Sequence, residues 1–386
     1  MRDARDSGRL RQASASMRRE PNQWIWSRSM DLFAFGGSVL IALALTGVGA
    51  ALDLLATMPE WLWIAAVLGV DVAHVHSTWF RIYLEPTEFR RRPILFIVVP
   101  LICLAVGIVL HLHSSRLFWT VLAYLAVFHF VRQQAGWMAI YRGRTGVHRR
   151  LDATIDDLAI YSATLWPLVW WHTHGPRRFA WFVPDDFHFW PNVDVARWTF
   201  PLYLLALALF FVRWIDVFLR EGHPAWGRAL VLASTAVAWY LGIVAFDSDY
   251  VFTVTNVLPH GIPYIIMIWF YVKRIPPGER ATPSATLWQA GPLAFAGVLF
   301  LLAFVEEMLW DMSIWHDRPW LFGPSIDPGA LKVLIVPLLS LPQATHYVLD
   351  GFIWRRRSNP ELRRQVESQP APGVPHPPSL GARRGD

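Results

Sequence analysis

The stretch Thr255-Asn256-Val257-Leu258-Pro259-His260-Gly261-Ile262-Pro263-Tyr264 lies inside an apolar run from about residue 250 to residue 272. Such a run is long enough to cross a bilayer as a helix. Its centre nevertheless carries a histidine set between prolines and a glycine. Ionisable side chains within a membrane span are costly and usually face the interior of the protein. The stretch therefore predicts a membrane-spanning helix that contributes to a polar site inside a bundle.

Apolar runs of similar length recur along the whole chain of 386 residues, which is 54% hydrophobic and 17% charged. Soluble domains carry about 25% charged residues, so this chain is short of water-facing side chains. The composition predicts an all-α fold, a polytopic transmembrane helix bundle with no separate soluble domain.

We expect about ten spans in a transmembrane domain that covers residues 31–357. They lie near residues 32–55, 61–84, 93–111, 117–141, 155–171, 198–219, 229–246, 250–272, 288–309 and 330–354. Residues 1–30 are predicted to form a disordered, basic cytoplasmic tail, and residues 358–386 a disordered tail rich in proline.

Basic clusters precede the first predicted span and follow the second, fourth, eighth and tenth. By the positive-inside rule, both termini are cytoplasmic, and a multi-pass protein of a bacterial inner membrane is expected. Membrane orientation explains the basic residues, so no nucleic-acid partner is expected. The single cysteine, Cys103, excludes an internal disulfide and cysteine-based metal sites.

Three other predicted spans also carry a histidine at their centre. The four histidines are His74, His129, His260 and His346, on the second, fourth, eighth and tenth spans. Each lies roughly nine to thirteen residues before the basic cluster that ends its span, which corresponds to about 14–20 Å along a helix. Four imidazoles at one depth on four helices predict a metal site in the core of the bundle.

Each histidine has polar neighbours three or four residues away, on the same helical face. The predicted partners of the ligands are Asp71, Gln133, Asn256, Gln343 and Asp350. Ligating histidines need such partners for the second ring nitrogen. Asp71 or Asp350 could instead bind the metal directly.

His76 is an alternative ligand to His74. Two residues of a regular helix turn through about 200°, so both cannot face one site. The polar neighbours of His74 favour it, and His76 joins the site only if the backbone unwinds there. In the eighth span, Pro259 and Pro263 do predict local unwinding, because proline removes a backbone donor.

Further polar residues lie on or near the predicted spans. Tyr264, Arg132 and Arg81 are candidate catalytic residues that would orient polar groups or oxygen. Glu306 and Glu307, at the outer end of the ninth span, are expected to lie at the membrane interface.

Three stretches resemble the Brp/Blh-type membrane carotenoid dioxygenases. They are Leu341-Pro342-Gln343-Ala344-Thr345-His346-Tyr347-Val348-Leu349-Asp350-Gly351-Phe352-Ile353-Trp354-Arg355, Val127-Phe128-His129-Phe130 and Pro259-His260-Gly261. Tyr264 stands where that family has a second histidine. The resemblance implies an integral membrane enzyme that cleaves β-carotene to retinal with iron held by histidines.

The sequence thus favours a non-haem iron oxygenase that uses dioxygen on a lipophilic substrate, such as a carotenoid, an isoprenoid or a lipid. Fe(II) is implied by the resemblance, since imidazole suits iron, copper and zinc alike. One alternative is a proton-coupled transporter that uses the buried histidine, aspartate and arginine side chains. The other is a non-catalytic assembly or pigment-binding membrane protein.

Overall fold

The structure is a computed structural model that describes residues 23–145, 149–190, 194–222, 224–273 and 282–354. These residues form helices and connecting loops, and no strand occurs among them. The all-α prediction is therefore confirmed.

Each of the ten predicted spans falls on a helical segment. The segments are α2–η1–α3 (Arg28–Ala51), α4 to η3 (60–80), α7 (Pro93–His113), α8 (Ser115–Arg144), α9 (Arg150–Thr173), α10 (Val195–Glu221), α11–η4 (Trp226–Ala245), α12 (Asp249–Lys273), α14–η6 (Pro292–Trp315) and η7–α16–α17 (Gly329–Ile353). Three short helices lie between them, α6 (Pro86–Arg91), α13 (Pro283–Ala290) and α15 (Pro319–Phe322).

Seven of these segments are long and apolar enough to cross a membrane, as expected of an integral multi-pass protein. The other three are residues 60–80, α8 and α9. Two of them carry predicted site residues near their centre, including His74 and His129, and such polar side chains lower the mean hydropathy of a helix. That these three also cross the membrane, which makes ten spans, stays a prediction, as does the cytoplasmic placement of the termini.

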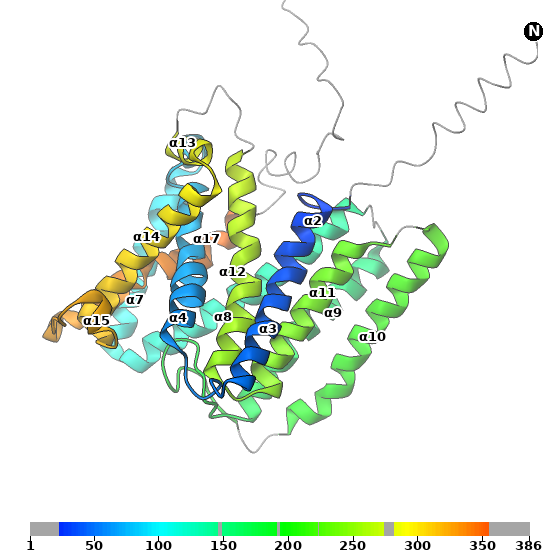
Figure 1. Ribbon diagram of the computed structural model, residues 1–386, viewed down its shortest axis with the longest axis horizontal. Coiled ribbons are helices and arrows are strands. Elements are labelled where there is room, and N and C mark those ends of the chain that lie inside the picture. The colour runs from blue at the N-terminus through cyan, green and yellow to red at the C-terminus, as the bar shows by residue number, and fades with distance from the viewer. Residues whose placement is uncertain (1–22, 146–148, 191–193, 223, 274–281, 355–386) are drawn as a thin grey trace, which may run out of the picture.

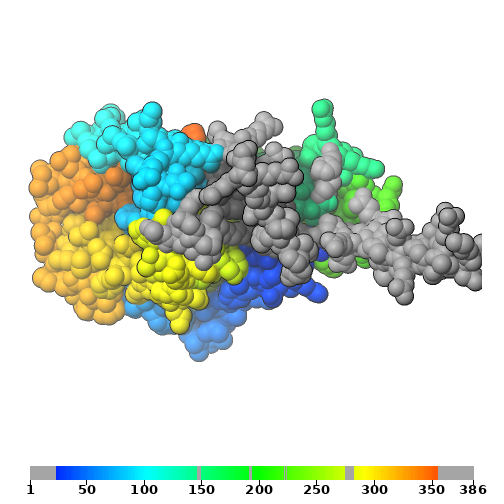
Figure 2. All heavy atoms as spheres, turned by 90° about the horizontal axis from the view of Figure 1, so that it is seen from above, coloured from blue at the N-terminus to red at the C-terminus, as the bar shows by residue number. Residues whose placement is uncertain are grey.

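Helix α12 lies near the middle of the bundle. Figure 1 shows α7, α14 and α17 on one side of it and α3, α9, α10 and α11 on the other. In the most apolar part of α12, 72% of the residues are buried inside the protein. The corresponding share is only 11% for α7 and 22% for α10. Figure 2 shows the molecule from above. The C-terminal helices lie at one end of its long axis, and α9 and α10 lie at the other. The buried central helix is the one that holds His260.

The predicted unwinding of the eighth span is wrong. Helix α12 runs without interruption from Asp249 to Lys273 and includes both Pro259 and Pro263. Proline is tolerated in membrane helices where neighbouring groups bond the freed backbone. In the same stretch, Gln133 on α8 donates from Nε2 to the carbonyl oxygen of His260 at 2.9 Å.

A wider backbone turn occurs instead in the segment that carries His74. Residues Trp63–Val72 form η2, a π-helix, which returns to α-helical geometry in α5 (Ala73–Ser77). Stretches of π-helix often mark functional sites. Nothing in the sequence pattern predicted it.

The predicted boundary of the N-terminal tail at residue 30 is too late. Ile25 and Trp26 are buried, and α2 begins at Arg28. The carboxylate of Asp31 accepts hydrogen bonds from the backbone N–H of both Ile25 and Trp26, and from the Tyr141 hydroxyl at 2.6 Å. The remainder of that tail, residues 1–22, and the predicted C-terminal tail lie outside the described residues.

Gly227 of α11 permits close packing against this tyrosine, and Gly227→Ala is expected to destabilise the protein. A Cβ there would lie 2.0 Å from the Tyr141 ring, which its bond to Asp31 holds in place. Overpacking of this kind costs about 1–3 kcal/mol. Thermal unfolding followed by size-exclusion chromatography should show a lower midpoint. Gly297→Ala, where the added carbon meets no atom within 4 Å, should leave the midpoint unchanged.

Candidate metal centre

Four histidines from four different helical segments meet inside the bundle. His74 lies on α5, His129 on α8, His260 on α12 and His346 on α17 (Leu341–Ile353). Each offers a ring nitrogen, and these four atoms all lie within 4.8 Å of one another. Two imidazole nitrogens on opposite sides of an ion lie about 4 Å apart, given metal–nitrogen distances near 2.0–2.1 Å. The predicted convergence of the four histidines is confirmed.

The four imidazoles are almost completely buried, with 1–3% of each residue exposed. Among the described residues, His74 and His260 have no hydrogen-bond partner for either ring nitrogen, and Nε2 lacks one in both His129 and His346. A buried polar atom left without a partner costs about 1–3 kcal/mol. Neutral imidazoles that present free nitrogens to one point fit a transition-metal ion, which would replace the missing partners.

Close packing of α12 against η2 brings His260 towards His74. A Cβ at Gly261 would lie 2.6 Å from Cγ1 of Val70, so only glycine permits this approach. On its other side the His260 ring stacks on Phe130, with 3.5 Å between centroids and 6° between planes. Neighbouring packing therefore fixes the orientation of this imidazole.

Hydrogen bonds also orient His346. The Thr78 hydroxyl lies 2.8 Å from Nδ1 of His346 and 2.9 Å from the Tyr264 hydroxyl. Tyr264 in turn donates to Oδ1 of Asp350 at 2.7 Å. The Asp350 carboxylate comes within 3.7 Å of Nδ1 of His129 and 3.8 Å of Nδ1 of His346. The structure thus places Tyr264 and Asp350 directly beside the cluster.

The other predicted partners of the ligands lie at different distances from the cluster. Gln133 supports the backbone of His260, and Oδ1 of Asp71 lies 3.6 Å from Nδ1 of His74. Asn256 donates instead to the carbonyl oxygen of Phe252 in its own helix. Gln343 donates to Glu306.

His76 is not among the four converging histidines. Because α5 is regular, His76 faces away from His74, and its Nε2 lies 2.8 Å from Oε2 of Glu306. Glu306 is only 6% exposed, so the prediction that it lies at the interface is wrong. A carboxylate on a membrane helix must be compensated, and both His76 and Gln343 contact it.

The two candidate catalytic arginines lie in different environments. Arg81 is fully buried, 3.4 Å from the Glu88 carboxylate and 4.1 Å from the centroid of the Tyr271 ring. It lines neither of the cavities beside the histidines. Arg132 is exposed, lines one of these cavities and donates to the Tyr161 hydroxyl.

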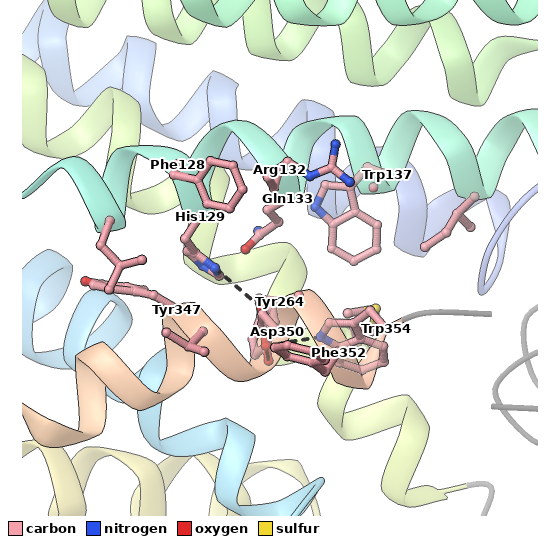
Figure 3. Close-up of a pocket in the computed structure, with 16 residues that line it drawn as sticks. Phe128, His129, Arg132, Gln133, Trp137, Tyr264, Tyr347, Asp350, Phe352 and Trp354 are labelled. Atoms are coloured by element: carbon pink, nitrogen blue, oxygen red, sulfur yellow. Dashed lines mark hydrogen bonds and ion pairs between the residues drawn. The ribbon is translucent and has the colours of Figure 1, made fainter. Parts of the chain in front are cut away.

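A cavity of about 590 Å³ lies on one side of the cluster, between α8, α12 and α17. Figure 3 shows side chains from α8 and α17 facing one another across it, with His129 and Asp350 joined by the dashed line. Its wall is mainly apolar, with Leu125, Phe128, Trp137, Ile140, Met267, Val348 and Phe352. A lipophilic molecule in this cavity would touch His129 and Tyr264.

A second cavity, of about 410 Å³, lies beside Asp71 and Val75 on the segment that carries His74. Its lining is more polar and includes Asp71, Asp249, Glu307, Asp317, Arg318 and Gln343. Tyr347, whose ring lies 5.1 Å from that of His129, lines both cavities.

Three residues that support the site were not among the predicted ones. They are Thr78, Phe130 and Tyr347. Thr78 carried a usable signal, because it lies four residues after His74 on the same helical face. Phe130 and Tyr347 each adjoin a histidine in the sequence, but their contacts depend on how the helices pack.

Thr78→Val is expected to weaken metal binding while the fold is kept. It removes the hydroxyl that bonds His346, and loss of such an outer partner typically costs 10–100-fold in affinity. Titration of the purified protein against a chromophoric chelator would measure this. Thr46→Val is the matched control, since that hydroxyl bonds only the carbonyl oxygen of Ala42 in its own helix.

The residues that the structure describes define a helical protein, with seven helices able to cross a membrane and a buried cluster of four histidines that could hold a metal ion. No family model, no curated protein and no solved structure matches this chain.

Proposed function

We propose that this protein is a membrane-embedded oxidoreductase, a non-haem iron oxygenase of a bacterial inner membrane that acts on a lipophilic substrate. The observation that carries the proposal is the set of four buried imidazoles with free ring nitrogens. His74, His129, His260 and His346 would hold the metal. Iron and the dioxygenase activity come from the resemblance to Brp/Blh-type enzymes, because the ligand set alone also suits copper and zinc.

The apolar cavity supports a lipophilic substrate. It reaches His129 and is walled by aromatic and aliphatic side chains. Sites for apolar molecules are concave, mainly apolar and carry a few polar groups that fix orientation. Here those groups are Tyr264, Asp350 and Gln133.

Bound iron would supply the redox chemistry that couples dioxygen to the substrate. Cleavage of one carbon–carbon double bond by O₂ places one oxygen atom on each of two carbonyl products. It therefore needs no external reductant. The chain's own residues, through Thr78, Tyr264 and Asp350, hold the histidine rings in fixed orientations.

We expect the iron-loaded protein to convert a polyene of the carotenoid class to carbonyl products under ¹⁸O₂, with one labelled oxygen in each product. Mass spectrometry of extracts from detergent-solubilised protein measures this. Removal of the metal with a chelator should abolish the products, and readdition of Fe(II) should restore them. Products that form equally well without metal would contradict the proposal.

A proton-coupled transporter is the second candidate function. The polar cavity beside Asp71 favours it, because Asp71 lines that cavity and its Oδ1 lies 3.6 Å from Nδ1 of His74. Substrate-dependent proton flux into liposomes that chelators do not affect would support the transporter over the enzyme.

A further inference from the structure

Arg132 is a charged side chain in an unusual place. It lies in the middle of α8, twelve residues before Arg144, which is about 18 Å along the helix axis. Its guanidinium donates to the Tyr161 hydroxyl, and no carboxylate lies within 4 Å of it in the part of the chain that the structure describes. Within the predicted fourth span such a charge would be costly, and charges so placed usually mark a functional site.

The apolar cavity reaches the protein surface at this arginine. Phe128, Arg132, Gly136 and Gly351 all line the cavity and are all exposed. A Cβ added at Gly136 or at Gly351 would meet no atom within 4 Å. The mouth between α8 and α17 is therefore open and carries a positive charge.

The charges of the cavity differ along its length. Arg132 stands at the exposed mouth, while the Asp350 carboxylate lies at the inner end, 3.7 Å from Nδ1 of His129. An anionic group would be attracted to the mouth and repelled from the inner end. Apolar side chains, among them Trp137, Met267 and Val348, also line the cavity.

We propose that this cavity binds a single-chain amphiphile with an anionic end group, held by Arg132 at the mouth while its apolar chain extends towards His129. The inference rests on the proposed function, because it names the substrate class of that site. A carboxylate and a phosphate share the required chemistry, since a guanidinium binds either through two parallel hydrogen bonds.

Binding of cis-parinaric acid to the metal-free, full-length protein in neutral detergent tests the inference. Energy transfer from tryptophan reports occupancy without turnover. Wild-type protein should bind the acid at least about tenfold more tightly than the corresponding alcohol, as expected for a charge-assisted hydrogen bond. Arg132→Gln should remove this difference and leave the affinity for the alcohol unchanged, and Arg132→Lys should restore part of it.

Matched variants locate the site. Gly136→Leu should weaken binding of acid and alcohol alike, because the new side chain fills the mouth without a clash. Gly297→Leu, on an exposed face of α14, and Arg116→Gln, at the other end of α8, should bind both as the wild type does. Equal binding of acid and alcohol by the wild type, or an unchanged preference in Arg132→Gln, would overturn the inference.

Competition identifies the source of the anion. Oleate and farnesyl phosphate should displace the probe, the first as a carboxylate and the second as a phosphate. Stronger displacement by dioleoyl phosphatidate than by either would refute a single-chain ligand. These outcomes do not depend on bound metal. If the protein shows charge-dependent binding but never binds metal, this inference is supported and the proposed enzyme function is wrong.

Discussion

Alanine at any one of His74, His129, His260 and His346 is expected to remove bound metal and, with it, turnover. Each imidazole would supply one of four ligands, so its loss should cost more than the 10–100-fold in affinity that is typical of outer partners. Metal content per folded chain, measured by elemental mass spectrometry after size-exclusion chromatography, should fall together in all four variants. Alanine removes buried ring nitrogens that have no partner and are costly to bury, so the folded fraction need not fall together with the metal content.

Two other histidines serve as controls for this result. His174→Ala changes an exposed residue and should retain metal. His76→Ala should also retain metal per folded chain, since its ring faces Glu306 rather than the cluster. Metal retained in any of the four cluster variants, or lost in His76→Ala, would show that the ligand set is wrong.

Arg81→Leu is expected to unfold most of the protein, and this is the second large effect. The guanidinium is fully buried, lies over the Tyr271 ring and pairs with Glu88, whose side chain is only 7% exposed. Removing one partner of a buried ion pair costs about 3–5 kcal/mol. Thermal unfolding and the yield of monodisperse protein measure the loss.

A double variant separates this structural role from the predicted catalytic one. Arg81→Leu combined with Glu88→Gln should recover part of the stability, because the buried carboxylate would otherwise keep only Arg91, at 3.7 Å, as a partner. The rescued protein should bind metal and turn over as the wild type does. A stable Arg81→Leu protein that binds metal but has lost turnover would instead establish the catalytic role.

The convergence of the four histidines could be predicted because it depends on local rules alone. Helical rise and the positions of basic clusters place His74, His129, His260 and His346 at one level, and the cost of burying polar groups in lipid turns them inward. The same rules favoured His74 over His76. The all-α class followed from composition.

The errors concern interactions between helices. Glu306 lies beside His76 although 230 positions separate them in the sequence. The sequence around Glu306 gives no sign that its carboxylate is buried against a histidine. Pro259 and Pro263 do not unwind α12, which is the most deeply buried of the seven candidate spans. The wide turns of η2 and the two cavities likewise arise from packing, which periodicity does not encode.

The central claim is that four imidazoles from separate helices bind one ion. X-ray absorption at the edge of the metal that copurifies with wild-type protein tests it most directly. The account predicts about one metal per chain, with about four imidazole nitrogens near 2.0–2.2 Å. Protein that is folded and active without metal, or an ion surrounded by oxygen with fewer than three imidazoles, would contradict it.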